Sequence, residues 1–425
     1  MIGRKEDYNV YKVPRGTKDI LPDEQRYWRL VEKEASDLAR LYGFSRLDTP
    51  VFETSSLFHR TVGEHTDLIG KETYDFQDRG NDMLTLRPEG TAPICRAYIE
   101  HGMYSMPQPV RLFYFCPVFR YDRPQAGRFR EHHQFGVEII GESDATVDAE
   151  VIHLGWTLLS NLGLKNLKLS INSIGDYEER KAYVIALRDY YGQHVDSLCR
   201  DCKYRLEKNP LRLLDCKKDV CQPFQNDAPP STAYLGQDSG SHWGELTGYL
   251  EALGVNYTID HRLVRGLDYY TRTVFEIQPG IEGAQSTLLG GGRYDGLIEQ
   301  LGGKHTPGVG FASGMERLII NMRRDNVLVS EPCGPTYLIA TINDTGTKEA
   351  MKLASQLRSM GVGVLIGSRG RSLRSQMRNA HSLKIPSVII LGEDEISKGT
   401  VIIRNMVSGE QEELPVEKFL RERND

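Results

Sequence analysis

The sequence predicts a protein of mixed helices and strands whose last part is a separate α/β domain. Residues 8–175 alternate helical stretches with strand-like runs, and strand and glycine patterns return at 262–318. Residues 176–255, between these two regions, are helical and polar. After the linker EPCGP at 331–335, strands and helices alternate to the end, as they do in an α/β domain.

Composition narrows the class of protein. The 425 residues are enough for two or three domains with their own cores, and 39% hydrophobic with 26% charged residues is ordinary for a globular protein. The opening MIGRKEDYNV lacks the features of a leader, and no apolar run approaches the roughly 18 residues of a membrane span. We therefore expect a cytoplasmic protein with no membrane partner. The net charge of −5 means that a nucleic-acid partner would need a local basic surface.

The first long helix is expected within residues 23–43. Apolar residues recur there at the spacing of one helix face, and Gly43 stands where a helix would end. The apolar positions are Trp28, Val31, Ala35, Leu38 and Leu41.

Residues 110–142 predict two long strands joined by a loop near 121–130. Long loops inside compact domains are usually functional, and this one is rich in planar cations that suit phosphates. Arg120 ends the first strand, and the loop contains Arg123, Gln125, Arg128 and Arg130.

The returning strand places a polar set on one face. Gln134, Gly136 and Glu138 alternate with the apolar Phe135, Val137 and Ile139. A glycine between a glutamine and a glutamate leaves a space in which a ligand can lie against the backbone. The alternative is a half-exposed hairpin with a polar outer face.

Other candidate residues lie in short glycine-containing motifs. Glu89 in TLRPEGT could accept hydrogen bonds from a ligand ammonium group, or it could belong to the start of the following helix. The glycines 290–292 of LLGGGRYDGL would allow a ligand to approach closely, or they mark a bend in a sheet. Arg265 in LVRGLDYYTRT and Arg317 in GVGFASGMERLII are also beside glycine or strand signals. If they converge with Arg120, these arginines would bind a polyphosphate.

Four cysteines form two pairs, in CRDC and CKKDVC. This spacing fits a tetrahedral structural zinc site, and the alternative is four free thiols. The cysteines are Cys199, Cys202, Cys216 and Cys221. The other three, Cys95, Cys116 and Cys333, are expected to be buried or to lie in a linker.

Residues 351–392 contain basic residues and no acidic ones. Arg371, Arg374 and Arg378 are predicted to share one stripe of a helix, opposite Leu373, Met377 and Ala380. A face of one sign on an acidic protein fits a phosphate backbone, although most charged faces are only solvated.

Several stretches together match one family. They are PRGTKDILP (14–22), DTPVFETSSLFHRTVGEHTDLIGKETYDF (48–76), TLRPEGT, VFRYDRPQAGRFREHHQFGVE, LVRGLDYYTRTVFE, GGGRYDGL and GVGFASGMERL. Over essentially its full length the chain resembles the bacterial histidyl-tRNA synthetases, which are class II aminoacyl-tRNA synthetases. LVRGLDYYT is specific to the histidine enzymes. The three motifs of the class would include Pro50, Arg120 and Arg317.

The resemblance implies an α+β fold. The catalytic domain, residues 1–175 and 256–330, would have an antiparallel sheet with flanking helices. A helical insertion domain would span 176–255, and an α/β anticodon-binding domain would span 331–425. The family is dimeric, so a homodimer with the first motif at its interface is implied.

The resemblance also implies a reaction and its residues. Histidine would attack the ATP α-phosphate, with Mg²⁺ present, to give histidyl-adenylate and pyrophosphate, and tRNA(His) would then take the histidyl group at its 3′ end. Arg265 and Arg120 would be catalytic, and with Arg128 and Arg317 they would bind ATP. Arg123 and Gln125 would face the tRNA acceptor end. Histidine would be bound by Glu89, Gly90, Thr91, Arg120, Gln134, Glu138, Arg265, Tyr269, Tyr270 and Tyr294.

Some positions depart from the family pattern. His132, Phe129 and Ala126 replace a more usual Phe, Tyr and Lys, which bears on contacts between the loop and tRNA. The cysteine quartet is not general in the family. Two other functions are open: a regulatory paralogue that binds histidine for ATP phosphoribosyltransferase, and a zinc-containing RNA-binding module without catalysis.

Overall fold

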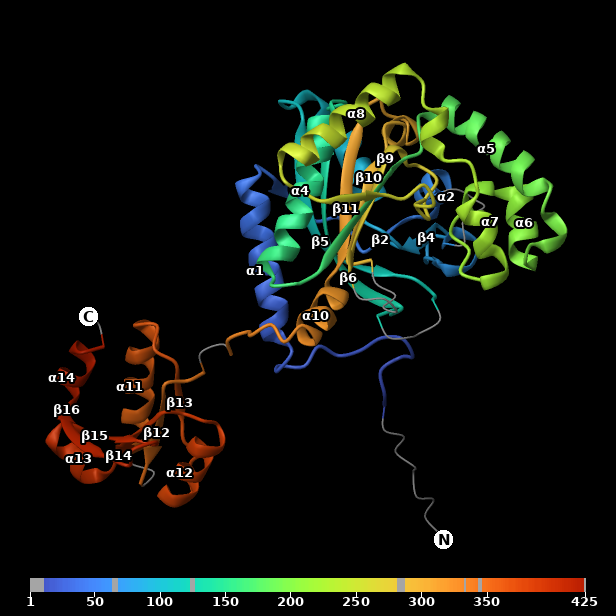
Figure 1. Cartoon of the computed structure of the whole chain (residues 1–425). Coiled ribbons are helices and arrows are strands. Elements are labelled where there is room, and N and C mark those ends of the chain that lie inside the picture. The colour runs from blue at the N-terminus through green and yellow to red at the C-terminus, as the bar shows by residue number, and fades with distance from the viewer. Residues whose placement is uncertain are drawn as a thin grey trace, which may run out of the picture. The chain divides into compact units, whose positions relative to one another are not determined.

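The chain forms two compact units, residues 1–329 and 330–425, in the computed structural model (Figure 1). None of its described helices has the length and apolar character that crossing a membrane requires. The structure describes residues 11–62, 68–122, 127–280, 287–331, 334–342 and 346–423.

The first unit is built on an eight-stranded sheet in the order β1-β5-β6-β11-β10-β9-β7-β8. All neighbours are antiparallel except the outermost pairs, β1 with β5 and β7 with β8. The antiparallel sheet implied by the resemblance is therefore confirmed. Its strands are β1 (Ser45–Arg46), β5 (Val110–Phe119), β6 (Glu131–Ile140), β7 (Leu167–Ser173), β8 (Tyr257–Ile259), β9 (Thr271–Pro279), β10 (Leu289–Arg293) and β11 (Gly308–Gly314).

Helices cover one face of this sheet and enclose the main core. They are α1 (Gln25–Leu41), α4 (Ala145–Asn161), α8 (Gln237–Ala252) and α10 (Met315–Arg324). Phe135, Val137 and Ile139 point into this core, as the alternation in β6 predicts. The helix α1 was also predicted, but Leu41 is wrong as a core position. It is 77% exposed because it is the last residue of the helix, shortly before the chain turns at Gly43 (φ 78°).

The opposite face carries a second core and most of the polar candidates. Helices α2 (Ser55–Val62), α3 (Thr91–Glu100) and α9 (Leu297–Gln300) pack there, beside a three-stranded sheet of β2 (Phe52–Thr54), β4 (Met83–Leu86) and β3 (Tyr74–Gln77). Tyr114, Tyr269, Tyr270 and Tyr294 are buried in this second core. The alternative of a half-exposed hairpin with a polar outer face is wrong, since Gln134 and Glu138 are buried.

The helical insertion consists of α5 (Tyr177–Gly192), α6 (Arg200–Lys208), α7 (Gln222–Asn226) and short 3₁₀ turns. Its small core includes Cys202, Cys216 and Cys221. Helix α8, from the same stretch of sequence, packs instead on α4 in the main core.

The second unit is an α/β domain around the sheet order β13-β12-β14-β15-β16. Helices α11 and α14 pack on one face and α12 packs on the other through Leu373, Met377 and Ala380. Arg371 was predicted on α12, but it precedes the cap residue Ser372, whose hydroxyl accepts from a backbone N–H of the first turn. The elements are β12 (Tyr337–Thr341), β13 (Val364–Ile366), β14 (Ser387–Leu391), β15 (Thr400–Asn405), β16 (Gln411–Pro415), α11 (Thr347–Ser359), α12 (Leu373–Ser382), α13 (Glu393–Lys398) and α14 (Val416–Arg421).

Candidate active site

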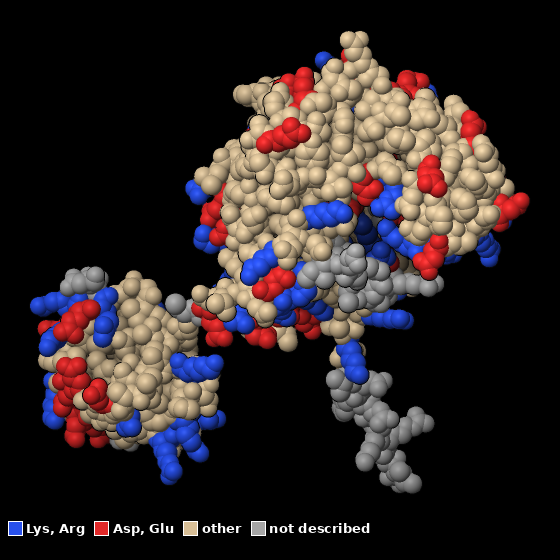
Figure 2. Space-filling model, in the orientation of Figure 1, with Lys and Arg blue, Asp and Glu red and all other residues tan. Residues whose placement is uncertain are grey.

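A polar cavity of about 370 Å³ lies in the first unit, on the face of the large sheet opposite the main core. Figure 2 shows Lys and Arg side chains gathered in a hollow of this unit. The structure brings ten of the predicted site residues to the cavity wall, from segments up to 228 positions apart (317 − 89). They are Glu89, Gly90, Thr91, Arg120, Arg128, Gln134, Arg265, Tyr269, Tyr270 and Arg317.

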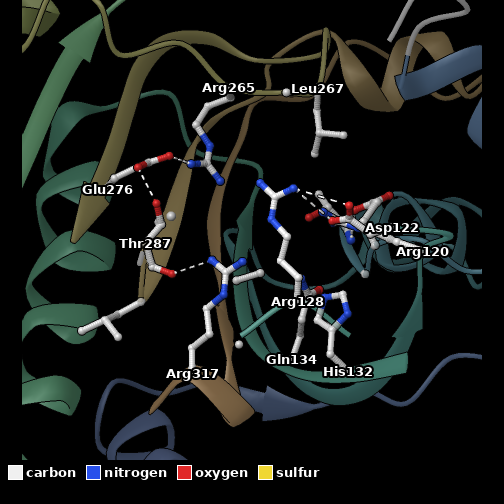
Figure 3. Close-up of a pocket in the computed structure, with 18 of the residues that line it drawn as sticks. Arg120, Asp122, Arg128, His132, Gln134, Arg265, Leu267, Glu276, Thr287 and Arg317 are labelled. Carbon is white, nitrogen blue, oxygen red and sulfur yellow. Dashed lines mark hydrogen bonds and ion pairs between the residues drawn. The ribbon is translucent and has the colours of Figure 1, made fainter. Parts of the chain in front are cut away.

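Arginines approach the cavity from different walls. In Figure 3, Arg265 and Arg317 point toward one another from opposite sides, and Arg128 lies between them and Arg120. Arg317 is held by the carbonyls of Gly127 and Thr287, each 3.0 Å away. Burial lowers the pKa of Arg317, and nearby Arg128 and Arg120 lower it further. Cations held this close together repel one another, so an anionic ligand would be stabilised among them.

Arg120 is fixed from behind, by a 2.8 Å hydrogen bond from its Nε to the carbonyl of Pro88. Burial lowers its pKa as well. Its neighbour in the wall is His132, one of the positions that depart from the family pattern. Burial, with the charges of Arg120 and Arg317, lowers the pKa of His132 to about 3. The imidazole is therefore neutral and adds no charge to the cluster.

Sequence reasoning missed the partner of Arg265. Glu276, on β9, accepts a hydrogen bond from Arg265 Nη1, and it also accepts from Thr287 Oγ1 at 2.6 Å and Gln278 Nε2 at 2.8 Å. Glu276 lies two residues after the buried Val274 on the same face of its strand. An acidic residue on that inward face was the signal that could have found it.

Glu138 lies beneath the cavity and is not in its wall. It is 0% exposed, and it accepts from the hydroxyls of Thr91 at 2.7 Å, Tyr114 at 3.3 Å and Tyr294 at 2.6 Å. Tyr294 is likewise buried below the wall. Burial raises the pKa of Glu138 to about 8, because hydroxyl donors offset only part of the cost of a buried charge.

The space expected beside Gly136 does not take a ligand. Tyr114 is paired with Gly136 across β5 and β6, and a Cβ atom on Gly136 would lie 2.2 Å from Cζ of that ring. A Cβ atom on Gly90 would also lie 2.4 Å from a ring carbon of Tyr114. Both glycines therefore accommodate the tyrosine, which the sequence reasoning did not single out, and that interpretation of Gly136 was wrong.

Of the two alternatives for Glu89, the place at the start of the following helix is confirmed, and the contact with a ligand ammonium group stays a prediction. Its two oxygens accept from the backbone N–H groups of Thr91 at 2.6 Å and Ala92 at 2.9 Å, which caps the start of α3. It also lines the cavity, and burial raises its pKa. Nearby, Gln134 Oε1 is buried with no hydrogen-bond partner among the described residues. An acceptor of this kind is available to a ligand N–H.

The glycines of LLGGGRYDGL make room for neighbouring side chains. Gly290 lines the cavity, and a Cβ atom there would lie 2.6 Å from Nη1 of Arg265. A Cβ atom on Gly292 would lie 2.9 Å from the ring of Tyr270. The glycines thus admit the arginine and the tyrosine to the site.

The predicted tRNA contacts that the structure describes, Arg371, Arg374 and Arg378, belong to the second unit. Arg123, Gln125 and Ala126 lie outside the described residues. Arg374 and Arg378 are exposed on α12, and Arg371 is exposed just before it. Figure 2 shows Lys and Arg side chains projecting from the second unit in the region where Figure 1 places α12.

The cysteine quartet is assembled in the insertion. The four sulfurs lie within 4.8 Å of one another, and Cys199 Sγ is 3.9 Å from Cys216 Sγ. Tetrahedral zinc with Zn–S bonds of about 2.3 Å requires sulfurs about 3.8 Å apart. Although burial opposes it, hydrogen bonds from Cys202 and the other cysteines lower the pKa of Cys199 to about 7. The donor set fits a zinc ion.

Comparisons with known proteins agree with one another. A family model described as histidyl-tRNA synthetase matches residues 16–179 and 211–318, and an anticodon-binding domain model matches 336–422. A histidine–tRNA ligase from Dehalococcoides mccartyi is 52% identical over 97% of this chain and 99% of its own length. The enzyme of that name from Caldanaerobacter subterraneus is 48% identical, covering 96% and 98%. The crystal structure of apo S. aureus histidyl-tRNA synthetase is 36% identical, covers 98% of this chain and 100% of its own, and has a TM-score of 0.82.

Proposed function

The chain belongs to the histidyl-tRNA synthetase family, and from this premise we propose that the cavity in Figure 3 is where it binds histidine and ATP. The protein is an ATP-dependent histidine–tRNA ligase. The histidine carboxylate attacks the α-phosphate of ATP, pyrophosphate leaves, and the terminal ribose of tRNA(His) then displaces AMP from the histidyl-adenylate. The observation that carries the location is the convergence of Arg120, Arg265 and Arg317 on one cavity.

Each of the arginines would bind a different part of the ATP triphosphate. Arg120 and Arg265 approach the α-phosphate from two sides and stabilise the charge that develops on it, which makes them the catalytic pair. Arg317 binds the γ-phosphate end, and Arg128 contacts the leaving pyrophosphate. A guanidinium that is already hydrogen-bonded, as Arg317 is to two carbonyls, loses little freedom on binding. Mg²⁺, which such ligases generally use, would neutralise charge on the ATP phosphates.

The amino acid binds between Glu89 and Glu138. Glu89 and the unpartnered Oε1 of Gln134 take the α-ammonium group, next to Gly90 and Thr91. A carboxylate has about four acceptor positions, and three hydroxyls donate to Glu138, so one position remains. Because Glu138 lies beneath the wall, the imidazole N–H would reach this position only when histidine binding displaces the wall residues above it, Thr91 and Tyr114. The aromatic walls are Tyr269, Tyr270 and, below them, Tyr294. An apolar amino acid would leave these buried polar groups unpaired and would be rejected strongly.

Transfer RNA would contact both units. We propose that Arg123 and Gln125 face the acceptor end, and that Arg371, Arg374 and Arg378 contact the anticodon arm. The match of residues 336–422 to an anticodon-binding domain supports the second contact. The regulatory paralogue usually lacks the anticodon-binding domain and the catalytic arginines. This chain has a match to that domain and all three cavity arginines, which disfavours the regulatory function. A zinc-containing RNA-binding module leaves the cavity unexplained.

We propose that the protein is a cytoplasmic homodimer whose interface includes the three-stranded sheet. Val51, Phe52, Phe76 and Met83 expose apolar side chains on or beside that sheet, which a partner subunit would cover. The family is dimeric through the motif that contains Pro50. Light scattering on wild-type and Phe52→Asp protein tests this, and a monomeric wild type at micromolar concentration would contradict it.

We also propose that the cysteine quartet binds one structural Zn²⁺ per chain. The sulfur separations support it, and a centre closed by four cysteines leaves no position for catalysis. Metal analysis of the purified protein, and the absorption of a Co²⁺-substituted form, test the site independently of activity. Protein that folds fully without metal and does not take up Co²⁺ would contradict it.

Histidine-dependent ATP–pyrophosphate exchange, measured beside the other amino acids, tests the cavity assignment. We expect exchange with histidine alone. Histidine binding without exchange would instead favour the regulatory function, and tight tRNA binding without either would favour the RNA-binding module.

A further inference from the structure

The insertion supplies part of the cavity wall. Arg212 and Asp215 line it together with Arg265, although they come from the insertion and not from the sheet. Arg212 lies in the 3₁₀ turn η4 (Pro210–Leu213) and pairs with Asp215 at 3.5 Å. A Cβ atom on Gly266 would lie 3.2 Å from Nη1 of Arg212, so this guanidinium lies directly beside the residue that follows Arg265.

The segment that carries Arg212 is bonded to the histidine-specific stretch. Asn209 Nδ2 donates to a carboxylate oxygen of Asp268 at 3.1 Å. Arg180, on α5, donates to the carbonyls of Asp268 at 3.0 Å and Tyr270 at 2.7 Å. Movement of the insertion would therefore change the positions of both Arg212 and the residues around Tyr270.

The same segment ends at the cysteine quartet. Cys216 directly follows Asp215, and its carbonyl accepts from Gln222 at 2.7 Å and Gln225 at 2.8 Å. Gln225 also donates to the carbonyl of Leu213 at 2.8 Å. Both glutamines lie on α7, which begins immediately after Cys221. A metal that joins Cys216 and Cys221 would hold α7, and with it the turn that carries Arg212.

We propose that Arg212 binds the phosphate chain of ATP from the insertion side, and that Asp215 and the metal-bound quartet position it. This rests on the active site and the zinc site proposed above. A guanidinium next to Arg265 would donate to the same anionic chain, and a fixed planar cation suits phosphate oxygens better than a mobile ammonium does. The small core of the insertion makes a metal the natural means of fixing this turn.

Arginine variants test the binding role in pyrophosphate exchange. In Arg212→Ala we expect kcat/KM for ATP to fall about 10- to 100-fold, as for loss of a hydrogen bond to a charged group, with partial recovery in Arg212→Lys. Histidine affinity measured calorimetrically without ATP should be unchanged. This result would distinguish a specific loss of ATP binding from a general structural defect. Arg188→Ala, an exposed arginine of the insertion outside the cavity wall, is the matched control. An unchanged kcat/KM for ATP in Arg212→Ala would overturn the role, whereas absent exchange in the wild type would refute the active site itself.

Metal removal tests the positioning. Cys216→Ser, and chelator-treated wild type returned to Mg²⁺, should lose zinc and show the ATP defect of Arg212→Ala. Combining Cys216→Ser with Arg212→Ala should add little to the defect in kcat/KM for ATP, because both changes remove the Arg212 contact with the phosphates. An effect of metal loss on the residues around Tyr270 would be seen separately, in histidine affinity measured without ATP. Cys333→Ser controls for the loss of a thiol and should keep both zinc and ATP affinity. Zinc-free wild type with normal ATP affinity would overturn the positioning by metal, and so would additive defects in the double variant.

Discussion

Two arginine–carboxylate pairs each have one member on the neighbouring strands β10 and β9 of the large sheet, and they differ in how completely they are enclosed. Arg293 and Asp148 are 0% exposed, and Arg293 also donates to the carbonyls of Glu142 and Asp144, which ties β10 to the start of α4. The side chains of Arg265 and Glu276 remain 21% and 14% exposed, and Arg265 Nε has no partner among the described residues. The first guanidinium is saturated by the protein, whereas the second belongs to a side chain in the cavity wall, where a ligand can contact it.

The same contrast holds for two fully buried carboxyls. Arg293 and His242 hold the pKa of Asp148 at about 2 despite its burial. Glu138 is equally buried, but its partners are hydroxyls, and its pKa rises to about 8. Burial alone therefore does not decide the charge of a group, and the sign of its nearest partners does. Asp148 stabilises the fold as a permanent anion, whereas Glu138 can respond to a ligand.

The largest effect is expected from Arg293→Leu, which leaves the buried charge of Asp148 uncompensated. We expect the free energy of unfolding to fall by about 3–5 kcal/mol in urea denaturation. Adding Asp148→Leu should restore part of that stability, because the isolated charge is then gone. A stable Arg293→Leu protein that fails only in ATP binding would contradict the structural role.

Arg265→Ala should have the opposite profile. Loss of a donor to the developing charge is expected to lower kcat for exchange about 100- to 1,000-fold, while the free energy of unfolding changes by less than about 1 kcal/mol. Glu276→Gln keeps the guanidinium of Arg265 and removes only the carboxylate that holds it. The exchange rate of Glu276→Gln should therefore lie between those of Arg265→Ala and the wild type. If Arg265→Ala unfolded as readily as Arg293→Leu, the distinction between the two pairs would be wrong.

The pH dependence of histidine activation should separate Glu138 from Asp148. Because the pKa of Glu138 is raised to about 8, its carboxyl is protonated below that pH in the free enzyme and gains acceptor capacity as pH rises. We expect kcat/KM for histidine to increase up to about pH 8. In Glu138→Gln this limb should disappear, leaving the titration of histidine itself as the internal control. Asp148 stays ionised over this pH range and cannot cause the increase. If kcat/KM for histidine rose with pH in the same way in the wild type and in Glu138→Gln, Glu138 would not be responsible for it.

The smallest effect is expected from the exposed Arg374 on α12. Replacing it with Ala removes one phosphate contact, which should raise KM for tRNA about 3- to 10-fold and lower the slope of binding against salt by about one. Exchange without tRNA should not change. Lys352→Ala on α11, which removes a cation already paired with Glu349, is the matched control and should leave KM for tRNA unchanged.

Much of the site could be predicted from the sequence, because charged residues beside glycines in strand-like segments indicate a ligand-binding site. Arg120, Arg265 and Arg317 were recognised as a set, and the structure brings them to one cavity. Their partners were not recognised. Glu276 is a single acidic residue in an otherwise ordinary strand, and Arg212 lies in a helical insertion with no signal that it faces the cavity.

The sequence by itself determined the secondary-structure elements and which functional groups the side chains offer. Period-two alternation set the inner face of β6, and the spacing of the cysteines grouped four sulfurs, because both are local properties of the chain. Only the tertiary structure decided which groups are paired. Gly136 faces the ring of Tyr114, Glu138 lies among hydroxyls, and Arg265 pairs with Glu276 in the cavity wall. These outcomes depend on contacts between strands and loops far apart in the chain, and a pKa or an open donor is a property of those contacts and not of any residue alone.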